Sequence, residues 1–383
     1  MTSLWGDDPT LAAAERVGSY LSLLHGLVTR ESPSGDVELN RRVAEFLAGE
    51  MERRGARVER HPAEGFGEHL VGRWEGVEHG QRPLLVIGHM DTVHPAGTLE
   101  RYPYRVDEDR VRGPGCYDMK GGLAAALEAL TLLTSYRERP RRDAVFVVTC
   151  DEEVGSDTSR ELIEVHARRA DAALVVEPCA PGGKIKSRRK GVGWYRLSIR
   201  GRAAHAGIEP DAGASAVHEL ARLTLRLLKL ADRETGTTTN VGVVGGGTRP
   251  NVVAEEAWAM LDVRFWTREE AERVDAAVRA LTPDDRRCTL ALDGGIDRLP
   301  LEQTPASDQL YAVARDEAAR LGFVLERTGT GGASDGNLTS GAGCPTLDGL
   351  GPDGGGAHTL DEHVFLADIP RRIALLAGLF RRL

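Results

Sequence analysis

The sequence predicts an α/β protein in which a mostly parallel sheet is interrupted by a smaller inserted domain. Three observations predict this architecture. The 383 residues exceed what one hydrophobic core usually supports, so two domains are expected. Apolar runs of strand length alternate with helical segments in the first half of the chain, a pattern typical of parallel sheets. A βαββαβ succession, which forms a compact domain by itself, follows in the middle.

The composition is that of an ordinary globular chain, with 41% hydrophobic and 28% charged residues. The formal net charge of -9 argues against nucleic-acid or anionic-membrane binding. The N-terminus lacks a signal-peptide pattern, and no segment approaches about 20 continuous apolar residues. The five cysteines form no C-x-x-C pair, which predicts buried, reduced thiols. We therefore expect a cytoplasmic protein with neither a membrane nor a nucleic-acid partner.

The first part of the chain alternates helices with apolar strands. Helical periodicity predicts helices at residues 11–29, 37–54 and 123–135. Continuous apolar runs predict strands buried on both faces at 84–88, 145–150 and 171–176. The glycine-rich turn 113–122 has neither the phosphate-loop nor the dinucleotide-binding spacing. A nucleotide site is therefore a weak interpretation of this turn.

Acidic and histidine side chains follow each predicted strand at its carboxyl end. They are His89 and Asp91 after the first, Asp151, Glu152 and Glu153 after the second, and Glu177 after the third. The carboxyl ends of parallel strands meet at one edge, where open α/β sheets bind ligands. Adjacent acids repel one another unless a cation or a proton compensates them. Imidazole and carboxylate groups are ligands of Zn²⁺ and similar ions, so we expect a metal site here, with a solvated acidic loop as the alternative.

The composition of the sequence changes after Glu177. A basic, turn-rich segment at 181–191 is a candidate linker. Beyond it, strands are expected at 194–201, 237–245, 252–265 and 288–292, and helices at 212–230 and 268–281. The last part carries expected helices at 307–321 and 369–382, a loop at 329–337 and a strand at 345–350. These boundaries divide the chain into residues 1–185, an insertion at 186–297, and residues 298–383.

Several short motifs occur in a fixed order along nearly the whole chain. They are Gly88-His89-Met-Asp91-Thr-Val, Gly115-Cys-Tyr-Asp118-Met-Lys-Gly-Gly122, Asp151-Glu152-Glu153-Val-Gly-Ser156, Val176-Glu177-Pro178, Gly201-Arg-Ala-Ala-His205-Ala-Gly207, Gly331-Gly-Ala-Ser-Asp335 and Gly356-Ala-His358. In this order they resemble the zinc-dependent aminoacylase and carboxypeptidase family. That family includes glutamate carboxypeptidases, acetylornithine deacetylase and succinyl-diaminopimelate desuccinylase. The resemblance is nearest to the glutamate carboxypeptidase branch.

The resemblance implies a catalytic domain, formed by residues 1–185 and 298–383, that binds two Zn²⁺ ions per subunit, with Co²⁺ or Mn²⁺ as possible substitutes. Asp118 would bridge the two ions. His89 and Glu177 would complete one metal site, and Glu153 and His358 the other. Such a pair of ions polarises a carbonyl group and lowers the pKa of a bound water.

The resemblance also assigns roles around the metals. Glu152 would be the general base that deprotonates the water. Asp91 would accept the second ring N–H of His89 and so fix its tautomer. The peptide bond between Asp118 and Met119 would be cis.

In the same way, the insertion 186–297 would be a ferredoxin-like lid through which two subunits dimerise. His205 would reach the partner's site and stabilise the tetrahedral oxyanion, although it could instead be a surface histidine. Asn251 and Arg264 would bind the carboxylate of the substrate, because a guanidinium pairs well with a carboxylate. Asn251 could also be only a turn residue. Hinges would lie near 183–191 and 294–300.

The function expected from these residues is that of a di-metal hydrolase. It would cleave an amide bond next to a free carboxylate in a small peptide or an N-acyl amino acid, as a glutamate carboxypeptidase does. A deacylase of the acetylornithine or succinyl-diaminopimelate type needs the same metals and base, so the motifs do not separate the two. An alternative of another class is a metal-stabilised binding protein without catalysis, which should have lost Glu152 or a ligand.

Overall fold

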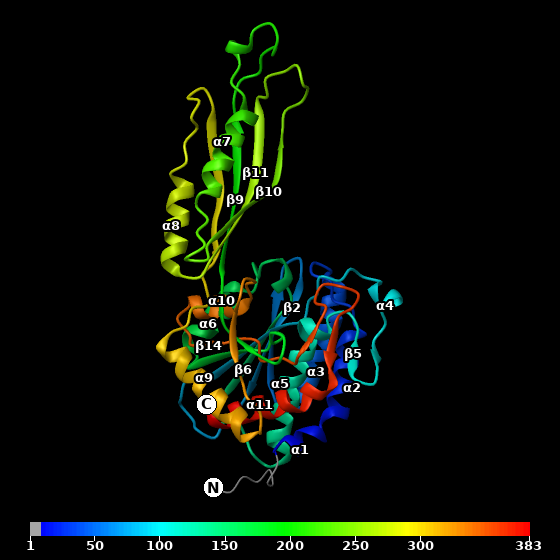
Figure 1. The fold of residues 1–383 in the computed structure, drawn as a ribbon. Coiled ribbons are helices and arrows are strands. Elements are labelled where there is room, and N and C mark those ends of the chain that lie inside the picture. The colour runs from blue at the N-terminus through cyan, green and yellow to red at the C-terminus, as the bar shows by residue number, and fades with distance from the viewer. Residues whose placement is uncertain (1–8) are drawn as a thin grey trace. The chain divides into compact units, whose positions relative to one another are not determined.

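The computed structural model describes residues 9–383, which divide into two compact units (Figure 1). Unit 1 runs up to Arg188 and resumes over Gln303–Gly329 and Ser334–Leu383. Unit 2 comprises Arg189–Glu302 and Thr330–Ala333. Residues 1–8, on which the signal-peptide prediction rests, lie outside the described part. Each unit has its own hydrophobic core.

The main sheet of unit 1 has six strands in the order β1-β2-β6-β3-β7-β14. Their bounds are Arg57–Ala63 (β1), Gly67–Trp74 (β2), Leu84–His89 (β3), Ala144–Thr149 (β6), Ala172–Val175 (β7) and Thr346–Leu347 (β14). Strand β3 is parallel to β6 and β7, and β14 is parallel to β7. Strands β1 and β2 extend one edge in antiparallel fashion. The predicted mostly parallel sheet is confirmed.

Alternate residues of the buried strands enter two different cores. Leu84 and Val86 of β3 pack into the larger one, whereas Leu85 and Ile87 pack into the smaller one. The larger core includes helices α2 (Val17–Val28), α3 (Val37–Arg53), α5 (Gly121–Ser135), α9 (Pro305–Arg320) and α11 (Ile369–Arg382), and the smaller one α6 (Arg160–Arg169) and α10 (Asp335–Gly341). Burial on both faces explains why these strands are apolar throughout.

Some elements differ from the sequence prediction. The helix expected at 11–29 is two helices, α1 (Pro9–Ala14) and α2, with Arg16 between them. The loop expected at 329–337 ends in α10, because Ser334 caps this helix by accepting the backbone N–H of Gly336 at 3.0 Å. The candidate linker contains β8 (Ile185–Arg189), which pairs with β13 (Arg327–Thr330).

A second, small sheet in unit 1 escapes the sequence prediction. Its strands are β4 (Arg105–Val106), β5 (Arg110–Arg112), β15 (Gly354–Gly355) and β16 (His363–Phe365), in the order β15-β16-β5-β4. Strands of two or three residues are too short to show a hydrophobic period. The sheet matters because it joins the segment before Asp118 to the loop that contains His358.

Unit 2 is a four-stranded antiparallel sheet in the order β10-β11-β9-β12. Its elements are β9 (Gly191–Arg200), α7 (Ala216–Leu228), β10 (Thr238–Gly246), β11 (Glu256–Phe265), α8 (Arg268–Arg279) and β12 (Thr289–Arg298). Apolar residues of both helices, such as Leu223 and Val274, pack with one face of the sheet, including Leu197. This arrangement confirms the predicted βαββαβ ferredoxin-like domain.

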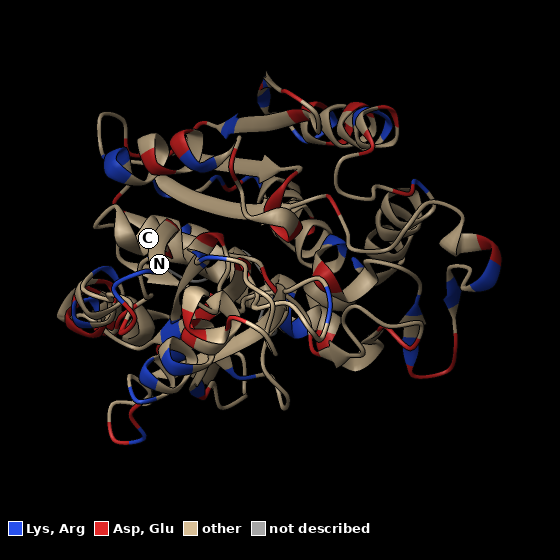
Figure 2. Cartoon of the chain, turned by 90° about the horizontal axis from the view of Figure 1, so that it is seen from above, with Lys and Arg blue, Asp and Glu red and all other residues tan. Residues whose placement is uncertain are grey.

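The five cysteines are buried free thiols, as predicted. None of the helices in the described part of the chain has the length and apolar content needed to span a membrane. Acidic and basic residues are interspersed along the helices and loops (Figure 2), as expected for a chain with a net charge of only -9.

Candidate metal centre

The strand ends of unit 1 bring most of the predicted ligands together. His89 is the last residue of β3, Glu153 lies in the single turn Glu152–Val154 after β6, and Glu177 follows β7. Because β3, β6 and β7 run parallel, these residues meet at one edge of the sheet. The Nε2 atom of His89 lies 3.5 Å from Glu177 Oε1.

Asp118 faces two histidines with its two oxygens. It lies in the irregular turn Cys116–Lys120, and its peptide bond with Met119 is cis. Its Oδ1 lies 3.4 Å from Nε2 of His89, and its Oδ2 lies 3.4 Å from Nε2 of His358. A carboxylate held between two imidazoles in this way has the arrangement that a bridging metal ligand needs.

His358 joins the cluster from a distant part of the sequence. It follows β15 and has a φ of +64°, the left-handed region that few residues other than glycine adopt. Its Nε2 lies 3.3 Å from Glu153 Oε2. The side chain is 53% exposed, in contrast to that of His89, which is 1% exposed. One side of the cluster is therefore open and the other is deeply buried.

Two buried atoms of the cluster lack a hydrogen-bond partner. They are Nε2 of His89 and Oε1 of Glu153. Nδ1 of His89 lies 2.9 Å from the backbone carbonyl of Asp91 and must donate to it, so Nε2 of the neutral ring carries the lone pair that a metal ion would bind. Buried polar atoms are nearly always hydrogen-bonded. Without a metal ion, Nε2 can face these carboxylates only if it carries a proton, which agrees with the raised pKa of His89. A divalent cation would satisfy all of these atoms.

The spacing of the candidate ligand atoms also fits a metal ion. One atom from each of His89, Glu152 and Glu177 lies within 4.8 Å of the others, and the same holds for His89, Asp118 and Glu153. Imidazole nitrogens and carboxylate oxygens are suitable donors for Zn²⁺. The residues present therefore fit the metal centre that the sequence predicts.

The pKa values of the histidines show that the cluster is short of positive charge. Burial lowers the pKa of His89, yet the carboxylates of Asp118, Asp91 and Glu177 hold it well above its usual range. Asp118 and Glu153 raise the pKa of His358 to about 10. Burial raises the pKa of Glu153. A bound cation would supply the missing charge.

Asp91 differs in detail from its predicted role. The ring N–H of His89 goes to the backbone carbonyl of Asp91, and the carboxylate lies farther away, 3.5 Å from Nδ1. The carboxylate instead accepts the backbone N–H groups of Glu152 and Glu153, each at 3.3 Å, and the hydroxyl of Ser34 at 2.6 Å. Asp91 thus fixes the turn that carries both glutamates.

The third acid of the triplet has a separate, structural environment. Asp151 is fully buried and accepts hydrogen bonds from the backbone and hydroxyl of Thr158 at 2.8 and 2.7 Å and from the hydroxyl of Ser159 at 2.6 Å. These contacts hold the segment that leads into α6. The three adjacent acids therefore have different surroundings, although they are neighbours in sequence.

Sequence reasoning missed two polar residues beside the centre, Glu362 and His94. Nε2 of His94 lies 2.7 Å from Oε2 of Glu362, and both side chains are buried. The only signal in the sequence is positional, because Glu362 follows His358 by four residues and His94 follows His89 by five. Neither spacing is informative without the fold.

In unit 2, His205 and Asn251 lie close together. A bridge joins His205 to Val252, and the backbone N–H of Ala206 donates to the carbonyl of Asn251 at 3.0 Å. Nδ1 of His205 accepts the backbone N–H groups of Gly207 and Ile208, each at 3.2 Å. The neutral ring then carries its proton on Nε2, which makes the exposed imidazole a hydrogen-bond donor.

Arg264 lies at the opposite end of the sheet of unit 2. It pairs with Val192 near the start of β9, whereas His205 follows the end of that strand. From Glu256 to Arg264 the extended strand covers about 27 Å, at about 3.4 Å per residue. The guanidinium forms an ion pair with Asp262 at 2.8 Å. Within one unit 2, the structure thus does not bring Asn251 and Arg264 together.

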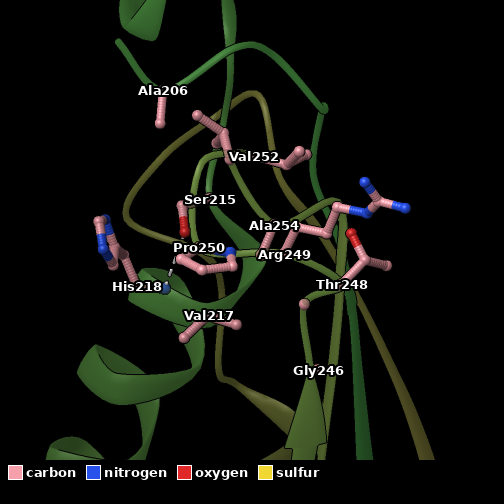
Figure 3. A pocket seen from close by; sticks show the side chains of 12 residues that line it. Ala206, Ser215, Val217, His218, Gly246, Thr248, Arg249, Pro250, Val252 and Ala254 are labelled. Carbon is pink, nitrogen blue, oxygen red and sulfur yellow. Dashed lines mark hydrogen bonds between the residues drawn. The ribbon is translucent and has the colours of Figure 1, made fainter.

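An open pocket of about 500 Å³ lies beside Asn251 in unit 2 (Figure 3). Its lining includes Ala206, His218, Arg249 and Val252. Figure 3 shows the imidazole of His218 and the guanidinium of Arg249 on opposite sides, with Pro250 between them. The pocket is thus next to the segment that presents His205.

Comparisons with known proteins agree with this geometry. Residues 85–382 match Peptidase family M20/M25/M40. Carboxypeptidase G2 of Pseudomonas sp. strain RS-16 is 32% identical over 96% of this chain and 90% of its own length. A succinyl-diaminopimelate desuccinylase of Verminephrobacter eiseniae is 30% identical over 79% of this chain and 77% of its own. The fold is similar to that of the aminopeptidase PepT of Bacillus cereus, with a TM-score of 0.80, 21% identity, and coverage of 96% and 98% of the two chains.

Proposed function

Because this chain belongs to peptidase family M20/M25/M40, we propose that it is a di-metal hydrolase that cleaves an amide bond next to a free carboxylate. The observation that carries the proposal is the position of Asp118, whose two oxygens face His89 and His358 at 3.4 Å each. His89 and Glu177 would hold one ion with Asp118, and Glu153 and His358 would hold the other. Zn²⁺ suits this donor set, and Co²⁺ or Mn²⁺ could take its place.

When bound, the ions would polarise the scissile carbonyl and make a water molecule more acidic. Glu152 is then the general base. Its carboxylate lies within 4.8 Å of the ligand atoms of His89 and Glu177, close enough to take a proton from a water held there. Glu152 can return the proton to the leaving nitrogen. Asp91 supports this step, because it holds the backbone N–H of Glu152.

His205 supplies the donor for the oxyanion. Its Nδ1 is occupied by two backbone N–H groups, so its Nε2–H is available to a negatively charged oxygen. We propose that His205 and Asn251 act in the site of a second copy of the chain, while Arg264 serves the substrate bound to its own. The separation of these residues within unit 2 supports this division.

We also propose that the chain forms a homodimer through unit 2, and the exposed apolar side chains of α7 and β10 support this. Val217, Leu225 and Leu228 of α7 are between 40% and 64% exposed, and Val243 and Val244 of the edge strand β10 are 52% and 61% exposed. An exposed edge strand with apolar neighbours favours pairing with another chain. The free thiols support a reducing, cytoplasmic location.

The substrate would be a small peptide or an N-acyl amino acid. The similarity to carboxypeptidase G2 over nearly the full chain favours an amino acid with a free α-carboxylate as the leaving group. The resemblance of the sequence motifs to glutamate carboxypeptidases favours glutamate as that amino acid. The similarity to a desuccinylase supports a second candidate, an N-acyl amino acid deacylase of the succinyl-diaminopimelate or acetylornithine type. The non-catalytic alternative is weaker, because every predicted ligand and Glu152 are present.

A substrate panel tests the proposal. Metal-free protein should be reconstituted with Zn²⁺, Co²⁺ or Mn²⁺ and assayed in parallel with peptides and N-acyl compounds that end in glutamate, with acetylornithine and with succinyl-diaminopimelate. We expect the highest kcat/KM for compounds ending in glutamate. Exclusive turnover of one of the two biosynthetic substrates would favour the deacylase, and no hydrolysis with any metal would favour a binding protein.

A further inference from the structure

We propose that Glu362, together with His94, is the positioning residue that sets the direction of Asp118 and thereby the affinity of the metal centre. Glu362 does not bind the metal itself in this account. It joins the three chain segments that supply His89, Asp118 and His358. The inference rests on the proposed metal centre and extends it to residues outside the ligand set.

The carboxylate of Glu362 accepts hydrogen bonds from four donors. Its Oε1 accepts the backbone N–H groups of Tyr117 at 2.9 Å and Asp118 at 2.8 Å. Its Oε2 accepts the backbone N–H of Gly115 at 2.7 Å and lies 2.7 Å from Nε2 of His94. A carboxylate has about four acceptor positions, so this one is filled. It therefore differs from Glu153, one oxygen of which has no partner.

The backbone around Asp118 is shaped to receive this carboxylate. Gly115 has a φ of +72°, and a Cβ there would lie 2.5 Å from the methyl carbon of Thr92. The turn thereby points three N–H groups at one anion, as in a backbone nest. One of the three belongs to Asp118 itself. Fixing its backbone fixes the direction in which its side chain leaves the chain, and that direction decides whether its oxygens face both histidines.

The other contacts of Glu362 connect the remaining ligand segments. His94 lies in the loop that begins at His89, so its hydrogen bond ties that loop to Glu362. The backbone carbonyl of Glu362 accepts the hydroxyl of Tyr102 at 2.7 Å, which fixes the segment that follows His358. Glu362 is 1% exposed, so these bonds lie in a dry environment, where hydrogen bonds to a charged group are strong. The three ligand segments thus share one buried anion.

The test compares variants that differ in how many of these bonds they keep. Glu362→Ala removes all four, and Glu362→Gln keeps one acceptor oxygen. His94→Leu removes only the link to the His89 segment, whereas His94→Gln keeps an N–H donor at a similar distance. Glu128→Gln is the matched control, because Glu128 is a fully buried carboxylate of the same unit with ion pairs to Arg16 and Arg54.

The measurements are Zn²⁺ affinity, by competition with a fluorescent chelator, and the visible absorption spectrum of the Co²⁺ form. We expect affinity to fall about 100-fold in Glu362→Ala and about 10-fold in Glu362→Gln and His94→Leu. The Co²⁺ bands should shift in these variants, and His94→Gln should restore both readouts. Glu128→Gln should lower thermal stability and leave Zn²⁺ affinity unchanged.

Wild-type Zn²⁺ affinity and an unchanged Co²⁺ spectrum in both Glu362→Gln and His94→Leu would overturn the inference. If Glu362→Ala does not fold, the His94 pair still decides the matter, because it alters a single hydrogen bond. A wild-type protein that binds no Zn²⁺ would instead overturn the proposed function. A fall in affinity of equal size in Glu128→Gln would show a general loss of structure and would also overturn the positioning role.

Discussion

Unit 2 and the metal centre of unit 1 both bury carboxylates, but they compensate them in opposite ways. In unit 2, Glu219 is fully buried, pairs with Arg222 at 2.9 Å and accepts the backbone N–H of Asp284 at 2.8 Å. Glu270 pairs with Arg273 at 2.7 Å and accepts the hydroxyl of Thr237 at 2.6 Å. In the metal centre of unit 1, by contrast, the acids face one another and two histidines.

The difference separates structural from functional acids. A buried carboxylate that serves the fold is supplied with its own cation or N–H donors, because leaving it without them costs several kcal/mol. Glu153 keeps an oxygen without a partner, and His89 a nitrogen, although both are buried. The compensating charge has to come from a ligand.

Metal removal should affect unit 1 and spare unit 2. Chelation should abolish hydrolysis and lower the free energy of unfolding of unit 1 by about 4 kcal/mol, relative to protein in free Zn²⁺ at about 1,000 times its Kd. Because the cores are separate, the unit 2 transition should stay in place. Calorimetry with and without chelator measures both transitions. Equal shifts of the unfolding transitions of unit 1 and unit 2 on chelation would contradict this difference between the units.

The His205→Ala variant tests whether unit 2 contributes to catalysis without contributing to metal binding. His205→Ala should lower kcat about 10²- to 10³-fold, the usual effect of removing one oxyanion donor, and leave KM nearly unchanged. Zn²⁺ content should remain that of the wild type, because the residue belongs to the other unit. Steady-state kinetics and metal analysis on the same preparation check this. Loss of metal together with activity would assign His205 to the ligand set instead.

Neutralising Glu153 should stabilise the metal-free protein. Burial raises the pKa of Glu153, so its charge costs free energy when no cation is present. Glu153→Gln should raise the free energy of unfolding of the metal-free protein by about 1–2 kcal/mol, while Zn²⁺ binding weakens. Urea denaturation in chelator measures the first effect. A loss of stability in chelator would mean that the ion pair with His358 outweighs the cost of burying the charge of Glu153.

Neutralising Glu270 should lower the free energy of unfolding, in contrast to the change at Glu153, and by a smaller amount. Arg273 and the threonine hydroxyls lower the pKa of Glu270 to about 2. A carboxyl group whose pKa is lowered on folding stabilises the fold at any pH above its unfolded-state pKa, which is near 4.5 for Glu270. This contribution is lost as the pH falls from there toward about 2. Glu270→Gln should therefore cost about 1 kcal/mol at neutral pH, since Arg273 is partly exposed, and nothing near pH 2. A cost that does not depend on pH would contradict the ion-pair explanation.

The parts of this structure that can be predicted from the sequence are those marked by long apolar patterns or by motifs of potential ligand and catalytic residues. The parallel strands, the ferredoxin-like domain and the ligand candidates at strand ends follow from such patterns. The sheet formed by β4, β5, β15 and β16 does not, because its strands are too short to be periodic. Glu362 and the detailed contacts of Asp91 are also invisible in sequence, because each depends on segments that only the fold brings together. The separation of Asn251 from Arg264 needs the strand register.

The most direct test of the central claim is the Glu152→Gln variant, measured for bound metal and for kcat on the best substrate of the panel. If the acids of unit 1 divide into ligands and a base, this variant should bind as much Zn²⁺ as the wild type, and its kcat should fall about 10²- to 10⁴-fold. A variant that binds zinc normally and hydrolyses at the full rate would contradict the account.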